Sequence, residues 1–212
     1  GTISGIMAMK YVKARFPKDT PGTFSSSESS LIVSILSVGT FFGAMLAPIP
    51  TDWLGRRWTL IISSLIVFNL GVALQTAATA IPLLCAGRCI AGFGVGLISA
   101  TIPLYQSETT PKWIRGAIVS CYQFAITIGL LLAACVIKGT EGRDDSGSYR
   151  IPLAIQFIFS LILGGGMLIL PDTPRFWITK GREDKAKESL SYLRKLPLDH
   201  PDLVEEYDDI MA

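Results

Sequence analysis

Two polar side chains lie within long apolar stretches of this sequence, and their types permit specific chemistry. Arg88 carries a charge that costs about 2.5–3.5 kcal/mol inside a lipid-spanning helix unless it faces protein or water. One hypothesis is that Arg88 couples the movement of a proton or of a gate to a bound ligand. The other is that Arg88 lies near the inner membrane boundary and is permanently paired with an acid or a carbonyl group.

The second polar side chain is Gln123, which shares a helical face with Thr127, Leu130 and Ala134. An amide can donate to one sugar hydroxyl and accept from another, while apolar neighbours cover the C–H faces of the ring. The alternative is a hydrogen bond between helices that involves no ligand. Gln156, in a later apolar stretch, is open to the same two interpretations.

Charged residues of both signs cluster in two short connections between apolar stretches. Asp52 precedes Arg56 and Arg57 around Gly55, and Glu108 precedes Arg115. Exposed ion pairs contribute only about 0–1 kcal/mol each, so such pairs can be broken and remade. The alternative is that the basic residues only mark the cytoplasmic side of the membrane, although that role does not require the acids.

The composition indicates a membrane protein rather than a soluble domain. The chain has 212 residues, a mean hydropathy of +0.46, half of its residues apolar and 17% charged. A net charge of +2 without a basic stripe excludes a nucleic-acid surface. No metal or cofactor is expected, because the four cysteines lie in apolar stretches far from the single histidine, His200.

Apolar runs of about 20 residues predict the membrane spans. Five are complete, at about 30–50, 58–79, 81–104, 117–138 and 149–170, and residues 1–16 read as the remainder of an earlier, truncated span. Residues 1–170 therefore form the membrane part, and 171–212 a cytoplasmic linker with one or two short helices over 176–196. The basic residues near 56, 112 and 180 fall on one side of these spans, which predicts that this side is cytoplasmic.

Small residues recur at every fourth position in two of the spans. They are Gly39, Gly43 and Ala47 in one span, and Gly92, Gly96 and Ala100 in another. This spacing is typical of close packing between helices in lipid, and packing is favoured here over direct contact with a ligand.

Taken together, the motifs resemble those of the sugar porter family of the major facilitator superfamily, especially its fungal hexose-transporter branch. The resemblance covers essentially the whole chain. Residues 52–57 match DxxGRR, 88–96 match RxxxGxGxG, 103–116 match PxYxSExxPxxxRG, and 171–175 are similar to PESPR. Trp53 stands where the family commonly has a basic residue, and Pro48 where it usually has glycine.

The resemblance implies an all-α membrane protein with two six-helix halves, of which this chain is the N-terminal half. It implies a multi-pass protein, in the plasma membrane by expectation, that moves a hexose by alternating access between the halves. Its partners would be the sugar, the bilayer and a C-terminal six-helix half. Proton coupling stays open, because the family's coupling acid precedes the sequence that begins here at Gly1.

The resemblance also assigns residues to two sites. The residues that match sugar-pocket positions are Gly39, Gln123, Ile126 and Leu130. The residues that match the gating charges are Asp52, Arg56, Arg57, Arg88, Glu108, Arg115 and Arg175.

The sequence leaves two alternatives open: a transporter-like sugar sensor, which is a receptor by class, and an inactive truncated product. Catalysis is not expected, because the sequence has no nucleophile with a base, no metal-ligand cluster and no phosphate-binding loop.

Overall fold

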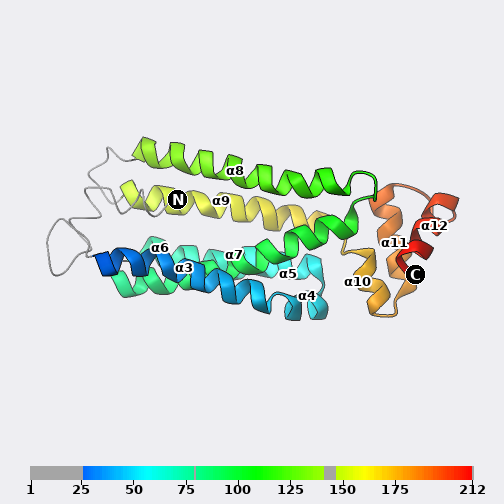
Figure 1. Cartoon of the computed structure of the whole chain (residues 1–212), viewed down its shortest axis with the longest axis horizontal. Helices are drawn as coiled ribbons and strands as arrows, with labels where there is room; N and C mark the ends of the chain where they lie inside the picture. The colour runs from blue at the N-terminus through cyan, green and yellow to red at the C-terminus, as the bar shows by residue number, and fades with distance from the viewer. Residues whose placement is uncertain (1–25, 79, 141–146, 212) are drawn as a thin grey trace.

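The computed structural model describes residues 26–78, 80–140 and 147–211, and this part of the chain is a bundle of long helices with a short helical cap at one end (Figure 1). Five of the described helical segments are long and apolar enough to cross a membrane. The predicted remnant of a first span, residues 1–16, lies outside the described residues.

The helices follow the apolar runs, with shifted ends. They are α3 (Ser26–Leu46), α4 (Pro48–Leu54), α5 (Arg56–Ile62), η1 (Ser63–Phe68), α6 (Asn69–Ala77), α7 (Ile81–Thr109), α8 (Arg115–Thr140), α9 (Gly147–Ile169), α10 (Pro174–Thr179), α11 (Glu183–Arg194) and α12 (Pro201–Met211). α7 continues five residues past the predicted end at 104, because the polar stretch up to Thr109 keeps its helical hydrogen bonds while facing the cap rather than lipid.

α3 and α7 form the most extensive helix contact of the described bundle. Gly39 and Gly43 of α3 lie against the backbone of α7, and Gly92 and Gly96 of α7 lie against the backbone of α3. A Cβ atom at any of these four positions would overlap backbone atoms of the facing helix. The glycines therefore allow the two backbones to approach closely, as their four-residue spacing predicts.

The span formed by α5, η1 and α6 packs against both α7 and α9. Its middle segment, η1, is a π-helix, which holds one residue more per turn than an α-helix and leaves carbonyl groups imperfectly satisfied. Ser160 of α9 donates a hydrogen bond of 2.6 Å to the carbonyl oxygen of Ser64 in η1. A side chain from the neighbouring helix thus satisfies a backbone group in the irregular segment.

The cap consists of α10, α11 and α12 and lies at the end of the bundle where α4, α5 and α7 meet (Figure 1). Its apolar core contains Ala186, Leu190, Leu203 and Tyr207. The sequence pattern predicts one or two helices over 176–196 and none over 197–212. The third helix, α12, begins at Pro201 and buries Leu203 and Tyr207, four residues apart, against α11.

Candidate functional site

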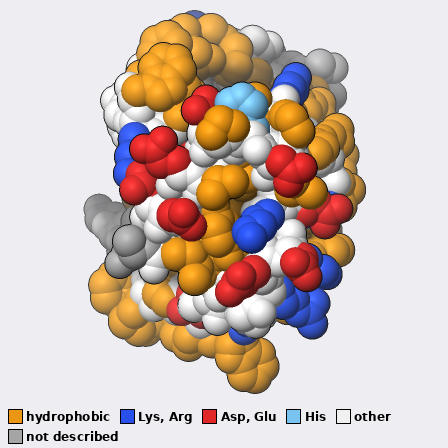
Figure 2. Space-filling view, turned by 90° about the vertical axis from the view of Figure 1, so that its right-hand side faces the viewer, with side chains coloured by type: hydrophobic (Ala, Val, Ile, Leu, Met, Phe, Trp, Pro, Cys, Tyr) orange, Lys and Arg blue, Asp and Glu red, His pale blue; other side chains and the backbone are white. Residues whose placement is uncertain are grey.

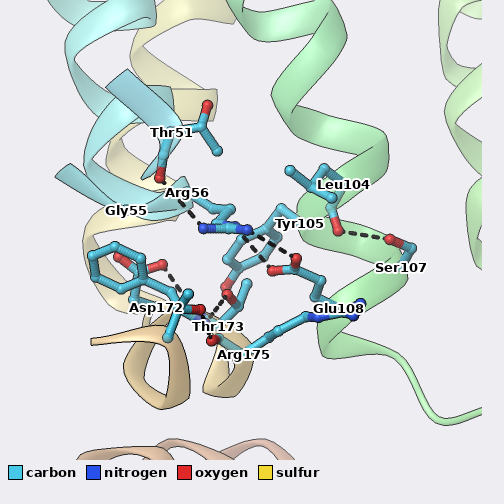
Figure 3. A network of polar contacts seen from close by, with 12 residues as sticks. Thr51, Gly55, Arg56, Leu104, Tyr105, Ser107, Glu108, Asp172, Thr173 and Arg175 are labelled. Atoms are coloured by element: carbon cyan, nitrogen blue, oxygen red, sulfur yellow. Dashed lines mark hydrogen bonds and ion pairs between the residues drawn. The ribbon is translucent and has the colours of Figure 1, made fainter. Parts of the chain in front are cut away.

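An ion pair between Arg56 and Glu108 lies where α5 meets the polar end of α7 (Figure 3). Arg56 Nη2 donates to Glu108 Oε1 at 3.2 Å, and Arg56 Nε lies 3.1 Å from Glu108 Oε2. The second contact is an ion pair without hydrogen-bond geometry, because neither atom has a hydrogen-bond partner. Only 11% and 5% of the two side chains are exposed, so the pair is far less screened than a surface pair.

Asp52 is an outer member of the same cluster. Its Oδ1 lies 3.6 Å from Arg56 Nη1, but 71% of its side chain is exposed. Arg56 Nη1 also donates to the carbonyl oxygen of Thr51 at 3.4 Å. The strength of this site therefore comes mainly from Glu108, while Asp52 contributes a solvent-screened charge.

The turn before Arg56 depends on Gly55, which has a φ of +95°. A Cβ atom there would overlap the carboxylate of Asp172, so the position requires glycine for its conformation and for its space. Asp172 Oδ1 accepts hydrogen bonds from the backbone N–H groups of Arg57 at 3.3 Å and Thr173 at 2.9 Å. The carboxylate thus joins the start of α5 to the start of α10.

Burial raises the pKa of Asp172 above its usual range, and the hydrogen bonds from Thr173 and Arg57 together with the charge of Arg56 oppose the shift. Tyr105 of α7 extends the same junction, because its hydroxyl donates to the carbonyl oxygen of Pro171 at 2.8 Å. These contacts fasten the α9–α10 connection to the ends of α5 and α7.

Arg57 has a different role from its neighbour Arg56. Its Nε and Nη2 donate to the carbonyl oxygens of Met167 at 3.1 Å and Leu168 at 2.8 Å. These carbonyl groups belong to the last turn of α9, where a helix has no internal donors left. A cation at this position also interacts favourably with the negative end of the helix dipole.

The cap is tied to the bundle through α11 and α12. Arg194 forms a two-point ion pair with Glu206, with Nε to Oε2 at 2.8 Å and Nη2 to Oε1 at 2.5 Å, and its Nη1 donates to the carbonyl oxygen of Thr109 at 2.9 Å. Lys112 pairs with Asp209 at 2.7 Å. The end of α7 and the loop after it are therefore held by the cap.

Arg115 and Arg175 line a cavity of about 270 Å³ at this junction, together with Glu108 and Lys112. Both arginines are exposed, and neither forms an ion pair with another described residue. The nearby carboxylates of Glu108, Glu206 and Asp209 are already paired with Arg56, Arg194 and Lys112. The structure thus brings six of the seven predicted gating residues to one end of the bundle. They are Asp52, Arg56, Arg57, Glu108, Arg115 and Arg175, and the last two are exposed.

The predicted sugar contacts of α8 lie on an open surface. Gln123, Ile126 and Leu130 are all exposed, and the Gln123 side chain makes no hydrogen bond to another described residue. Thr140 is the one buried residue of α8. The amide of Gln123 is therefore free to bind a group from outside the described helices.

The fourth predicted contact, Gly39, lies elsewhere. It is buried against the backbone of Cys89 and Phe93 in α7, which gives it a packing role. Its contact with a sugar stays a prediction.

Arg88 is apart from the other charges. In α7, positions 88 and 108 are about 30 Å apart at 1.5 Å per residue, so Arg88 lies toward the opposite end of the bundle from the basic loops. Of the two hypotheses for Arg88, the one that places it near the inner boundary does not fit this position, because α7 runs away from the basic loops toward Ile81. The Arg88 guanidinium is buried, and its Nε donates to the carbonyl oxygen of Ile32 at 2.7 Å.

Arg88 also lines a cavity of about 550 Å³, together with Gln75 and Gln156. α8 contributes Gly129 and Leu132 to this cavity, but not Gln123 or Leu130. The predicted sugar contacts of α8 and Arg88 thus lie on separate surfaces of the described bundle.

The predicted site residues do not include Asp172, Tyr105 or Arg194. Asp172 and Tyr105 belong to motifs that were recognised, and an acid directly before the Thr-Pro start of a helix was a usable signal. Arg194 pairs with residues 12 and 85 positions away, and no local spacing predicts such contacts.

The chain is similar to known transporters along its whole length. The family described as "Sugar (and other) transporter" matches residues 1–212. One similar protein is the major facilitator-type transporter ecdD of Aspergillus rugulosus, which is 59% identical in a match that covers 100% of this chain and 40% of ecdD. Another is the high glucose sensor RGT2 of Saccharomyces cerevisiae, which is 45% identical in a match that covers 100% of this chain and 28% of RGT2.

Solved structures show the same fold. The proton:xylose symporter XylE, bound to 6-bromo-6-deoxy-D-glucose, is 26% identical with a TM-score of 0.82, and the match covers 99% of this chain and 48% of XylE. The chain thus spans less than half the length of each of these proteins.

Proposed function

Since the chain belongs to the sugar transporter family of the major facilitator superfamily, we propose that it is the N-terminal six-helix half of a carrier that moves a hexose or a related sugar across a membrane by alternating access. It is an integral membrane protein of a transporter family and not an enzyme. The proposed location is the plasma membrane.

The observation that carries this proposal is the open face of α8. A helix that is apolar enough to span a membrane exposes nearly all of its length, and it carries an amide without a partner among the described residues. Lipid alone would leave the donors and acceptor of Gln123 unsatisfied. A sugar held between this face and a second helical half would satisfy them, while Ile126 and Leu130 would cover the apolar faces of its ring.

The charges at the cytoplasmic end support the alternating-access step. Arg56 and Glu108 hold the ends of α5 and α7 together, whereas Arg115 and Arg175 remain available to carboxylates outside the described residues. Several charge pairs of about 0–1 kcal/mol each, made in one state and lost in the other, are enough to shift states that differ by a few kcal/mol. We infer that these two arginines form the half of the latch that is released on opening.

Sugar uptake into cells without hexose carriers tests the proposal, using the complete gene that encodes this chain. Gln123→Ala should lower uptake by several-fold to tenfold, since a lost hydrogen bond is worth about 0.5–1.5 kcal/mol. The matched control is Cys121→Ala, because Cys121 is exposed on the opposite side of the same helix and should leave uptake unchanged. Equal uptake by both variants would remove Gln123 from the sugar site.

Two further outcomes separate the alternatives. Uptake that is the same at two external pH values argues against proton coupling, which would otherwise involve Arg88. The similarity to a glucose sensor makes a receptor the second candidate. A receptor would transmit a Gln123-dependent sugar signal in these cells without uptake, and an inactive product would show neither.

A further inference from the structure

A pocket of about 340 Å³ lies where the membrane part meets the cap. Side chains from α5, α10 and α11 line it. They include Arg57, Trp58, Trp177, Lys185, Glu188 and Tyr192.

The pocket lies at the level of the membrane surface. α5 begins at Arg56 and α9 ends at Ile169, and both belong to predicted membrane spans. The last residues before the pocket, Leu168, Ile169 and Leu170, are apolar and exposed. Trp58 and Tyr192 are about half exposed, as is typical of aromatic side chains at the boundary between lipid and water.

The cations of the pocket have capacity left for an anion. Arg57 uses Nε and Nη2 to cap α9, which leaves its Nη1 without a described partner. Lys185 lies 4.8 Å from the centre of the Trp177 ring and forms no ion pair with a described residue. Figure 2 shows that this end of the molecule mixes basic, acidic and apolar side chains rather than presenting one sign of charge.

The carboxylates of the pocket differ in their availability. Asp172 is buried and accepts backbone hydrogen bonds from Arg57 and Thr173, so its carboxylate is not available to a ligand. Glu188 is exposed and has no ion-pair partner among the described residues, beside the half-exposed ring of Tyr192. A carboxylate with an aromatic ring is a suitable environment for an ammonium group.

We propose that this pocket binds the headgroup of a zwitterionic phospholipid from the surrounding leaflet. The phosphate lies against Arg57 and Lys185, the ammonium group lies toward Glu188 and Tyr192, and the acyl chains lie along the exposed apolar end of α9. Two cations suit a phosphate group and one unpaired carboxylate suits an ammonium group, so the pocket fits a zwitterionic headgroup better than a purely anionic one. The proposal does not depend on sugar transport.

Native mass spectrometry of the protein, purified from its complete gene in detergent with added phosphatidylcholine, tests this site. The fraction of protein that retains one lipid should fall at least threefold in Lys185→Gln and in Glu188→Gln. Lys187→Gln is the matched control, because Lys187 lies on the same helix over the Tyr207 ring at 4.9 Å but lines a different pocket. It should retain lipid like the unchanged protein.

Two additional arms identify the source and the sign of the ligand. Glycerophosphocholine, which has the headgroup without acyl chains, should fail to compete at the same concentration. Glu188→Lys should weaken phosphatidylcholine retention further. The proposal is overturned if all glutamine variants retain lipid equally, or if glycerophosphocholine competes. It is also overturned if the unchanged protein binds phosphatidylglycerol more strongly than phosphatidylcholine. Circular dichroism should show equal helix content in every variant.

Discussion

α7 and α8 are neighbouring helices of similar length and apolarity, yet they are buried to very different extents. α7 packs against α3, η1 and α6 and buries ten residues, whereas α8 buries only Thr140. The difference follows the small residues. Gly92 and Gly96 bring α7 against α3, while Gly129 of α8 has no atom within 4 Å of the Cβ position that glycine lacks.

This contrast separates two roles that hydropathy alone does not distinguish. A lipid-spanning helix with a stripe of small residues is held by its own half of the protein. A helix of equal hydropathy without such contacts is available to something else, which we propose is a sugar and a second half. Changes on α7 should therefore affect folding, and changes on α8 should affect transport.

The largest effect is expected where α7 carries a buried charge. Glu108→Ala leaves the Arg56 guanidinium without its partner in a site that is largely shielded from water, and should lower the free energy of unfolding by about 3 kcal/mol. Arg115→Ala, at the start of α8, removes an exposed charge without a described ion pair and should change it by less than about 0.5 kcal/mol. Thermal unfolding in detergent measures both, and similar losses would contradict the contrast.

A somewhat smaller effect on stability is expected from adding one methyl group to the α3–α7 contact and one to the exposed face of α8. Gly39→Ala places a Cβ against the carbonyl oxygen of Cys89 in α7 and should cost about 1–3 kcal/mol, since the two backbones must separate. Gly129→Ala on α8 meets open space and should be neutral or slightly stabilising. The yield of monodisperse protein and its unfolding temperature report both changes, and a tolerated Gly39→Ala would show that α3 and α7 are less tightly packed.

The smallest effect is expected from the pH response of Asp172, which lies between α9 and α10, next to the Pro171 carbonyl group that Tyr105 of α7 contacts. Because burial raises its pKa in the folded protein, the fold retains a proton that the unfolded chain has released, and stability should fall as pH rises from 3.8 through the raised value. Asp172→Asn should flatten this part of the stability curve. An equally steep decrease in the variant, measured by thermal unfolding over that pH range, would assign the dependence to other groups.

The sequence predicted the fold class, because long apolar runs, basic loops and family motifs all point to the same architecture. It also predicted which glycines pack, since their spacing on α3 and α7 is local information. It left two hypotheses open for Arg88, and the one that placed this residue near the inner boundary does not fit its position toward the Ile81 end of α7. The alternation of the basic loops already implied the direction of this span.

Other features could not be predicted from the sequence for physical reasons. Arg194 pairs with Glu206 and donates to the carbonyl oxygen of Thr109. Both contacts depend on how the cap packs against the bundle. The extra helix α12 is short, and its acidic composition hides the apolar positions Leu203 and Tyr207. No pattern signals η1 either, because serine residues at 63 and 64 occur in regular helices as well.

The π-helical turn of η1 has a consequence for how this span can change in length. Each residue of an α-helix advances the side chains by about 100°, so one added residue normally rotates everything beyond it away from its partners. η1 already holds a surplus residue, and Ser160 supplies a hydrogen bond where the winding loosens. Losing one residue between 63 and 68 would convert the loose turn into a regular one and leave α5 and α6 on their present faces, so this span has a built-in place to absorb a deletion that α8 lacks.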